Sequence, residues 1–69
     1  MNKDFVLKVG SNIKKHREKK NLSQFELAVE IGVTPGAIGN LEVAKNDTSL
    51  SRIFDIAKAL DVEPYELLK

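Results

Sequence analysis

Apolar residues recur every three or four positions along most of the chain, with charged and polar residues between them. This spacing is typical of amphipathic helices, whose apolar stripe faces a common core. It predicts five helices joined by short links, over residues 4–20, 24–31, 35–43, 50–60 and 64–68. The predicted fold class is therefore all-α, a compact five-helix domain.

The predicted helix over residues 50–60 is the most apolar of the five, and we expect it to form the floor of the core. Its apolar positions are Leu50, Ile53, Phe54, Ile56, Ala57 and Leu60. Ser49 precedes it as an N-cap residue, because a serine side chain can accept a hydrogen bond from the first helical turn. The last helix has Tyr65, Leu67 and Leu68 as its apolar face.

Gly10 lies inside the first predicted helix and weakens it by roughly 1 kcal/mol relative to alanine. It marks either close packing against another element or a later helix start near Ser11. Residues 1–10 are therefore an N-terminal extension or the beginning of the first helix. Asn21 follows the lysine-rich last turn of this helix, where asparagine tolerates the left-handed backbone conformation.

The central stretch from Leu22 to Glu42 carries two independent helix-start signals. Ser23 followed three residues later by Glu26 forms a capping box, and Thr34 followed by Pro35 places a proline at the first helical position. Gly32 between them can adopt a positive φ, ending the first helix and turning the chain. We expect the apolar positions Leu27, Ala28, Ile31, Ile38 and Leu41 to point inward. The pattern indicates a helix-turn-helix.

A chain of 69 residues makes one domain, spanning 1–69, because it is too short to support two separate cores. With 42% apolar residues it is globular, and no apolar run approaches the roughly 20 residues of a membrane span. There is no signal-peptide pattern and no cysteine. We expect a cytoplasmic protein held together by helix packing alone.

The net charge of +1 does not by itself suggest a nucleic-acid partner. Its distribution is more informative, because cations crowd one segment against a single carboxylate, Glu18. These cations are Lys14, Lys15, Arg17, Lys19 and Lys20. A solvated lysine face is the usual meaning of such a run, so we expect at most two of these residues to contact phosphates.

A helix in the DNA major groove presents its first turn and the residue one turn later to the base edges. The candidates for base readout are Thr34, Pro35, Gly36, Ala37 and Asn40, none of them charged. Asn40 is the strongest, because its amide can pair bidentately with adenine, a contact worth about 1–3 kcal/mol of discrimination. The alternative is that Asn40 is an ordinary solvated helix residue.

Phosphate contacts are expected from residues flanking the two central helices. Gln24 stands in the first turn of the earlier helix, where exposed N–H groups can meet a phosphate oxygen. The other phosphate candidates are Lys14, Lys45 and Asn46. Gly36 and Gly39 together cost about 2 kcal/mol against alanine. Either Gly36 closely approaches DNA and Gly39 a neighbouring helix, or the weakness is tolerated.

Enzymatic chemistry is not indicated. His16 lies among cations, the serines mostly occupy helix starts, and no carboxylate pair or metal-ligand spacing stands out. We predict no enzyme activity, no metal, no cofactor and no small-molecule ligand.

From Ile13 to Leu68 the chain resembles the Cro/cI-type (XRE) helix-turn-helix domain of phage and bacterial repressors. The matching residues are Ile13 to Gln24, Glu26-Leu27-Ala28, Ile31-Gly32-Val33, Ile38, Leu41-Glu42, Lys45, Ser49-Leu50, Ile56 to Leu60 and Glu66-Leu67-Leu68. The resemblance implies a lambda-repressor-like domain whose third helix enters the major groove. It also implies a homodimer on a pseudo-palindromic operator and a role in transcription regulation, with double-stranded DNA as partner.

The resemblance also implies roles by position. Gln24 falls on a phosphate-binding glutamine, the four positions Thr34, Gly36, Ala37 and Asn40 on recognition positions, and Arg17 with Glu42 on a structural ion pair. Four residues depart from the family pattern. Ala44 and Asp61 replace frequent turn glycines, Val43 replaces a common phosphate-contacting polar residue, and Asp47 adds negative charge to a loop that often faces DNA.

The sequence therefore predicts a sequence-specific DNA-binding regulator, a repressor. The alternative is a helix-turn-helix protein-interaction module, or an antitoxin or restriction-modification controller, with weak or no independent DNA binding. We place the dimer interface at Tyr65 and Leu68, with the loop before residue 50 as the alternative location.

Overall fold

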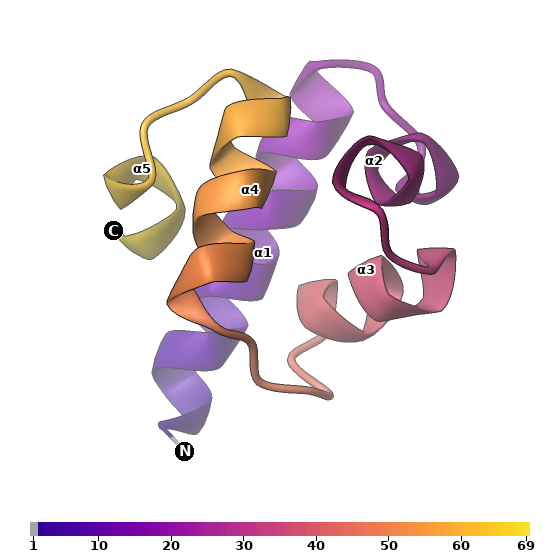
Figure 1. Cartoon of the computed structure of the whole chain (residues 1–69). Helices are drawn as coiled ribbons and strands as arrows, with labels where there is room; N and C mark the ends of the chain where they lie inside the picture. Colours follow the sequence, from indigo (N-terminus) through magenta and orange to yellow (C-terminus); the bar gives the residue numbers. More distant parts are fainter. Residues whose placement is uncertain (1) are drawn as a thin grey trace.

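The computed structural model describes residues 2–69, and the described chain forms five helices without strands. They are α1 (Lys3–Lys19), α2 (Gln24–Ile31), α3 (Pro35–Glu42), α4 (Leu50–Leu60) and α5 (Tyr65–Leu68). The all-α, five-helix prediction is confirmed, and each end lies within one residue of its predicted position. Figure 1 shows α1 and α4 side by side, with α2 and α3 on one flank and α5 on the other.

Each of the first four helices begins at a capped residue. Ser23 Oγ accepts the N–H of Glu26 at 2.9 Å, and Glu26 Oε1 accepts the N–H of Ser23 at 2.8 Å, which completes the predicted capping box. Thr34 caps α3 and Ser49 caps α4 in the predicted manner. Asn2 caps α1 by accepting the N–H of Phe5 at 2.9 Å, so α1 begins before Gly10.

The same four helices end in one backbone arrangement, a left-handed residue followed by a hydrogen bond back to the last turn. The left-handed residues are Asn21, Gly32, Ala44 and Asp61. After α3, for example, Lys45 N–H donates to Asn40 O at 2.8 Å and Ala44 N–H donates to Leu41 O at 3.1 Å. Ala44 adopts a φ of +59° despite its Cβ, so the chain forms with alanine a turn that favours glycine.

The core draws side chains from all five helices. Its buried residues are Val9, Ile13, Leu27, Ala28, Ile38, Leu41, Ile53, Ile56, Ala57, Leu60 and Leu67. Ile13, Leu27, Ile38, Ile56 and Leu67 are the largest of the fully buried side chains. The predicted inward positions of α2 and α3 are thus buried, apart from Ile31, which packs partly buried against the core.

Gly10 marks a close crossing of α1 over the end of α3. A Cβ at Gly10 would meet the carbonyl oxygen of Leu41 and lie 2.9 Å from that of Glu42. Both obstacles are backbone atoms, which cannot move aside as a side chain can. Of the two explanations for Gly10, close packing is therefore correct.

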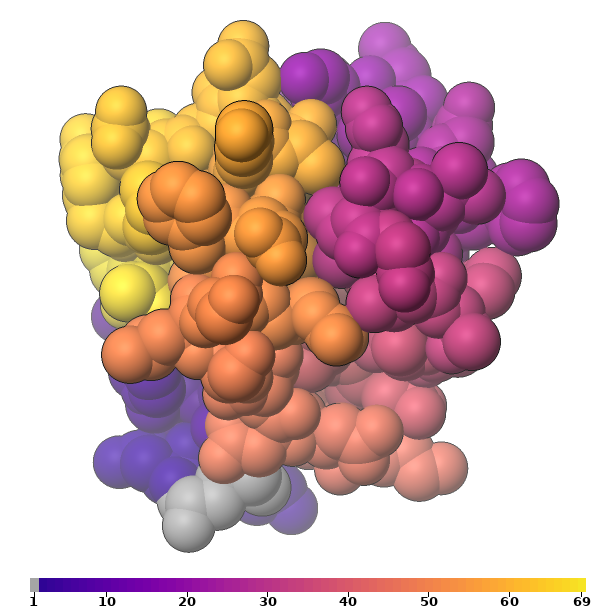
Figure 2. Space-filling view, viewed as in Figure 1, coloured from indigo at the N-terminus to yellow at the C-terminus, as the bar shows by residue number. Residues whose placement is uncertain are grey.

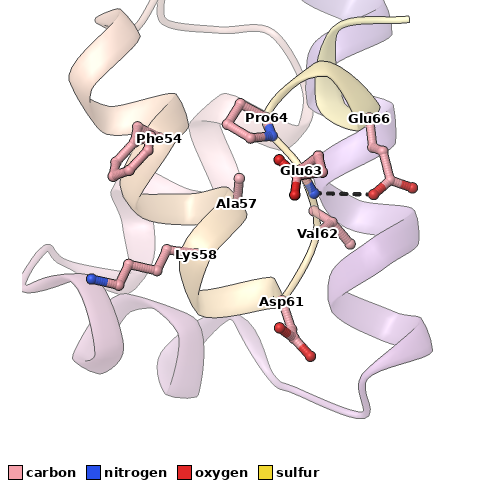
Figure 3. A pocket seen from close by; sticks show the side chains of 8 residues that line it. All are labelled: Phe54, Ala57, Lys58, Asp61, Val62, Glu63, Pro64 and Glu66. Atoms are coloured by element: carbon pink, nitrogen blue, oxygen red, sulfur yellow. Dashed lines mark hydrogen bonds between the residues drawn. The ribbon is translucent and has the colours of Figure 1, made fainter.

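Two residues predicted to line the core on α4 are exposed instead. Leu50 is 81% exposed and Phe54 is 57% exposed, because the four-residue α5 covers only part of this helix. Figure 2 shows the face on which α4 and α5 lie next to each other. Phe54 borders an open hollow between them, where Glu66 accepts the N–H of Glu63 at 3.0 Å (Figure 3).

Within residues 2–69, none of the helices combines the length and the apolar character needed to cross a membrane.

Candidate nucleic-acid interface

The α2–turn–α3 unit is fixed at its turn by Gly32, whose φ of +74° lies in the left-handed region. Val33 N–H then donates to Ala28 O at 2.9 Å, which closes the end of α2. Two residues later Pro35 opens α3. The turn thus follows from local chemistry that the sequence makes visible, and α3 packs against both α2 and α1.

Arg17 and Glu42 join α1 to the last residue of α3 inside the protein. Arg17 Nε donates to Glu42 Oε2 at 2.6 Å and Arg17 Nη2 donates to Glu42 Oε1 at 3.2 Å. The side chains are only 9% and 1% exposed, respectively. Arg17 Nη1 also donates to Leu22 O at 2.7 Å, which ties the start of the α2 region to the same guanidinium. Arg17 is therefore occupied inside the fold and is not free to contact DNA.

The hydrogen bonds from Arg17 to Glu42 raise the pKa of the guanidinium above its ordinary value, while burial acts in the opposite direction. A raised pKa in the folded state stabilises the fold below the unfolded pKa, and this contribution is lost only as pH rises through the folded value. Both values lie above the pH range in which proteins are usually handled. Arg17 thus stays charged and paired with Glu42 throughout that range.

Gln24 lies exposed at the first position of α2, but its amide points toward α3. Its Nε2 donates to Glu42 Oε1 at 3.0 Å, and a Cβ on Gly39 would lie 3.3 Å from its Oε1. Spacing along the sequence did not reveal this link, because it joins residues 18 positions apart on different helices. The predicted approach of Gly39 to a neighbouring helix takes the form of contact with this side chain.

Of the candidate base-reading residues, Gly36 and Asn40 lie four positions apart on the side of α3 opposite the buried Ile38 and Leu41. Thr34 and Gly36 are exposed, whereas Ala37 and Asn40 are half-buried. Thr34 Oγ1 accepts the N–H of Ala37 at 3.2 Å, so its hydroxyl hydrogen remains available to another acceptor. A Cβ on Gly36 would have no atom of another part of the described chain within 4 Å, so packing among residues 2–69 does not require glycine there.

The remaining phosphate candidates are spread more widely. Lys45 and Asn46 are exposed and directly follow the left-handed turn at Ala44, which leaves them beside the C-terminal end of α3. Lys14 is exposed on α1, one turn before Arg17. Asp47 is exposed in the same loop as Lys45. The cations are thus accessible, and a carboxylate lies near two of the candidates.

The candidate dimer residues lie on α5, away from α2 and α3 (Figure 1). Tyr65 is 61% exposed, whereas Leu68 is half-buried against the core. Asn12 anchors this helix, because its Nδ2 donates to Leu67 O at 3.1 Å and to Lys69 O at 3.0 Å. Sequence reasoning missed Asn12, since a single asparagine on α1 carries no local sign of a distant helix end.

A protein-family model described as helix-turn-helix matches residues 13–67. A curated relative, the uncharacterized HTH-type transcriptional regulator y4wC of Sinorhizobium fredii, is 41% identical over 56 residues, which make up 81% of this chain. The chain spans 39% of the length of that relative.

Two solved structures are similar over most of the chain. The restriction-modification controller protein C.AhdI from Aeromonas hydrophila is 37% identical, with a TM-score of 0.86 over 90% of this chain and 94% of its own. The P22 c2 repressor, solved in complex with a synthetic operator, is 30% identical, with a TM-score of 0.81 over 88% and 92% of the two chains.

The fold and these matches define the class of the domain, a helix-turn-helix domain of the kind found in proteins named as transcriptional regulators and repressors. The chain belongs to the helix-turn-helix family. This confirms the family that was predicted from the resemblance of Ile13 to Leu68.

Proposed function

We propose that this domain is the sequence-specific DNA-binding unit of a transcriptional repressor that binds a pseudo-palindromic operator as a homodimer. In this proposal α3 enters the major groove, where Thr34 and Asn40 read base edges and Gly36 and Ala37 permit close approach. Such a regulator acts where the DNA lies, so we expect it in the cytoplasm at the nucleoid.

The observation that carries the proposal is the outward stripe of α3. Gly36, Asn40 and Val43 follow one another at four- and three-residue spacing, so they share one side of the helix. None of them is buried, while the opposite side is held by Ile38, Leu41 and Glu42. A rigid helix with an uncharged and accessible outer side suits the major groove, because nothing on that stripe repels phosphates.

Dimerisation is supported by exposed apolar side chains on α4 and α5, among them Leu50, Phe54 and Tyr65. Phe54 and Pro64 line one hollow, and Leu50 and Leu68 line another, so α4 contributes to the same region as α5. We propose that the interface extends from Tyr65 and Leu68 onto α4. Two such units would place two α3 helices against successive major grooves about 34 Å apart.

Sedimentation at micromolar concentration tests this interface. Tyr65→Lys should shift the protein toward the monomer, because a charge replaces an aromatic ring at the proposed contact. Phe25→Lys on α2 is the matched control, since Phe25 is 63% exposed and Tyr65 is 61% exposed. A wild type that sediments as a monomer even on its selected DNA, or equal shifts in both variants, contradicts the interface.

DNA recognition is tested by selecting duplexes from a random pool and measuring fluorescence anisotropy across a range of salt concentrations. The proposal requires affinity to fall steeply with salt, because cations that neutralise phosphates release counterions. It also requires clear preference for the selected duplex over a scrambled one of the same composition. Undetectable binding, or binding that ignores salt, contradicts it.

A second candidate is a protein-interaction module, or an antitoxin or controller, with weak or no independent DNA binding. Val43 favours it, because this apolar side chain is 67% exposed at the end of α3. Asp47 in the following loop adds a negative charge near the proposed phosphate contacts. Failure of the anisotropy experiment, with the fold intact by circular dichroism, would favour this candidate.

A further inference from the structure

The Gln24 side chain reaches α3, where it contacts Glu42 and Gly39. Its amide nitrogen reaches Glu42, and its amide group is the nearest neighbour of Gly39, with all three of the closest atoms belonging to it at 3.3 to 3.7 Å. A Cβ at position 39 would press on the end of this flexible side chain. Alanine at this position would therefore push the Gln24 amide aside by a few tenths of an ångström, with no backbone atom among its three nearest neighbours.

Glu42 determines which way the Gln24 amide faces. An ionised carboxylate only accepts hydrogen bonds, so the amide nitrogen and not the amide oxygen must point toward it. Arg17 donates to both oxygens of this carboxylate, so the guanidinium and the Gln24 amide share Glu42 as their acceptor. The amide nitrogen carries two hydrogens, and the bond to Glu42 uses one of them.

Arg17 also neutralises the charge of Glu42 at this position. Without that cation, a carboxylate 3.0 Å from the Gln24 amide nitrogen would repel any phosphate approaching the same group. With it, the second amide hydrogen of Gln24 can be donated to a phosphate oxygen. The side chain is then already held in one arrangement, so little conformational freedom is lost on binding.

We infer that Glu42 and Gly39 are positioning residues for a DNA phosphate contact made by Gln24, with Glu42 orienting the amide and Gly39 providing its space. This inference rests on the proposed DNA binding. It gives Gly39 a role distinct from that of Gly36, whose Cβ would meet no other element among residues 2–69.

The first test needs no DNA. In the nuclear magnetic resonance spectrum of the free wild type, the side-chain amide protons of Gln24 should show contacts to the Hα protons of Gly39. Gly39→Ala should shift both Gln24 side-chain amide signals, with the circular dichroism spectrum unchanged. Absence of the contact in the wild type, or unshifted signals in Gly39→Ala, overturns the inference. This outcome does not depend on whether the protein is later found to bind DNA.

The second test is a double-mutant cycle on DNA, with the selected duplex and its scrambled form as probes. Gly39→Ala should weaken binding to both duplexes by about tenfold, the scale of one charge-assisted hydrogen bond, because a phosphate contact carries no base preference. In a Gln24→Ala background, Gly39→Ala should have no further effect. The slope of affinity against salt should stay unchanged, since a neutral amide releases no counterion.

Gly36→Ala serves as the contrast in this cycle, because a direct effect on DNA should persist when Gln24 is absent. If Gly39→Ala also keeps its effect in the Gln24→Ala background, its Cβ acts on DNA directly and the positioning role is wrong. If wild type binds neither duplex, the proposed function fails, while the contact measurement still decides whether the Gln24 amide is held against Gly39.

Discussion

Arg17 and Glu42 are separated by 25 positions in the chain, yet the guanidinium nitrogen Nε and the carboxylate oxygen Oε2 lie 2.6 Å apart inside the fold. This pair fastens the C-terminal end of α3 to α1, and Gly10 brings the same part of α3 against α1 two turns earlier. The proposed reading helix is therefore held at its far end by contacts that do not use its outward side.

Removing one partner of this pair should be costly. Arg17→Met leaves the Glu42 carboxylate buried without its cation, and breaking a buried pair in this way typically costs about 3–5 kcal/mol. We expect a loss of that size in the free energy of unfolding, measured by urea denaturation. The double variant Arg17→Met with Glu42→Leu should recover most of it, because no buried charge is left unpaired. A loss below about 1 kcal/mol in the single variant would mean that the pair is effectively solvated.

Gly10→Ala should also destabilise the domain, although alanine is the better helix former. The helix preference favours alanine by about 1 kcal/mol, whereas forcing a methyl group into a packed contact costs up to about 3 kcal/mol. Here the obstacles are the carbonyl oxygens of Leu41 and Glu42, so the steric term should win and the net loss should be roughly 2 kcal/mol. Thermal and urea unfolding measure it, and an unchanged or raised stability contradicts the close crossing.

Gly36→Ala should show the opposite sign for stability. No atom lies within 4 Å of the added Cβ, so the helix preference acts alone and should stabilise the fold by about 0.5 kcal/mol in this first turn. Affinity for the selected duplex should fall by about tenfold, the scale of one impaired contact, if α3 lies close to DNA there. Higher stability with unchanged affinity would place DNA elsewhere on the domain.

Gly32 and Gly10 show what could and could not be predicted from the sequence. The caps at Ser23 and Thr34 and the turn at Gly32 depend on neighbouring residues, so the two central helices and their turn were visible in the sequence. Gly10 had two explanations, because its partner is a backbone segment about 30 residues away whose position only the fold defines.

The candidate site was predictable only in part for the same reason. The reading positions on α3 follow from helical spacing, but the bond between Gln24 and Glu42 and the anchoring of α5 by Asn12 are tertiary contacts. The exposure of Phe54 reverses a prediction from periodicity, because periodicity identifies an apolar stripe and does not say how much of it a short neighbouring helix can cover.

Asn40→Ala tests base readout with little interference from stability. The side chain is half-buried and has no hydrogen bond within the described residues, so removing it should change the free energy of unfolding by less than about 1 kcal/mol. Discrimination at one base pair in each half-site should fall by about 1–3 kcal/mol, measured by anisotropy with singly substituted duplexes. Lys45→Ala is the comparison, because a lost phosphate contact should weaken all these duplexes alike and lower the salt slope. If Asn40→Ala instead weakens every duplex equally, Asn40 does not read a base, and specificity rests on Thr34 and on the shape of the operator.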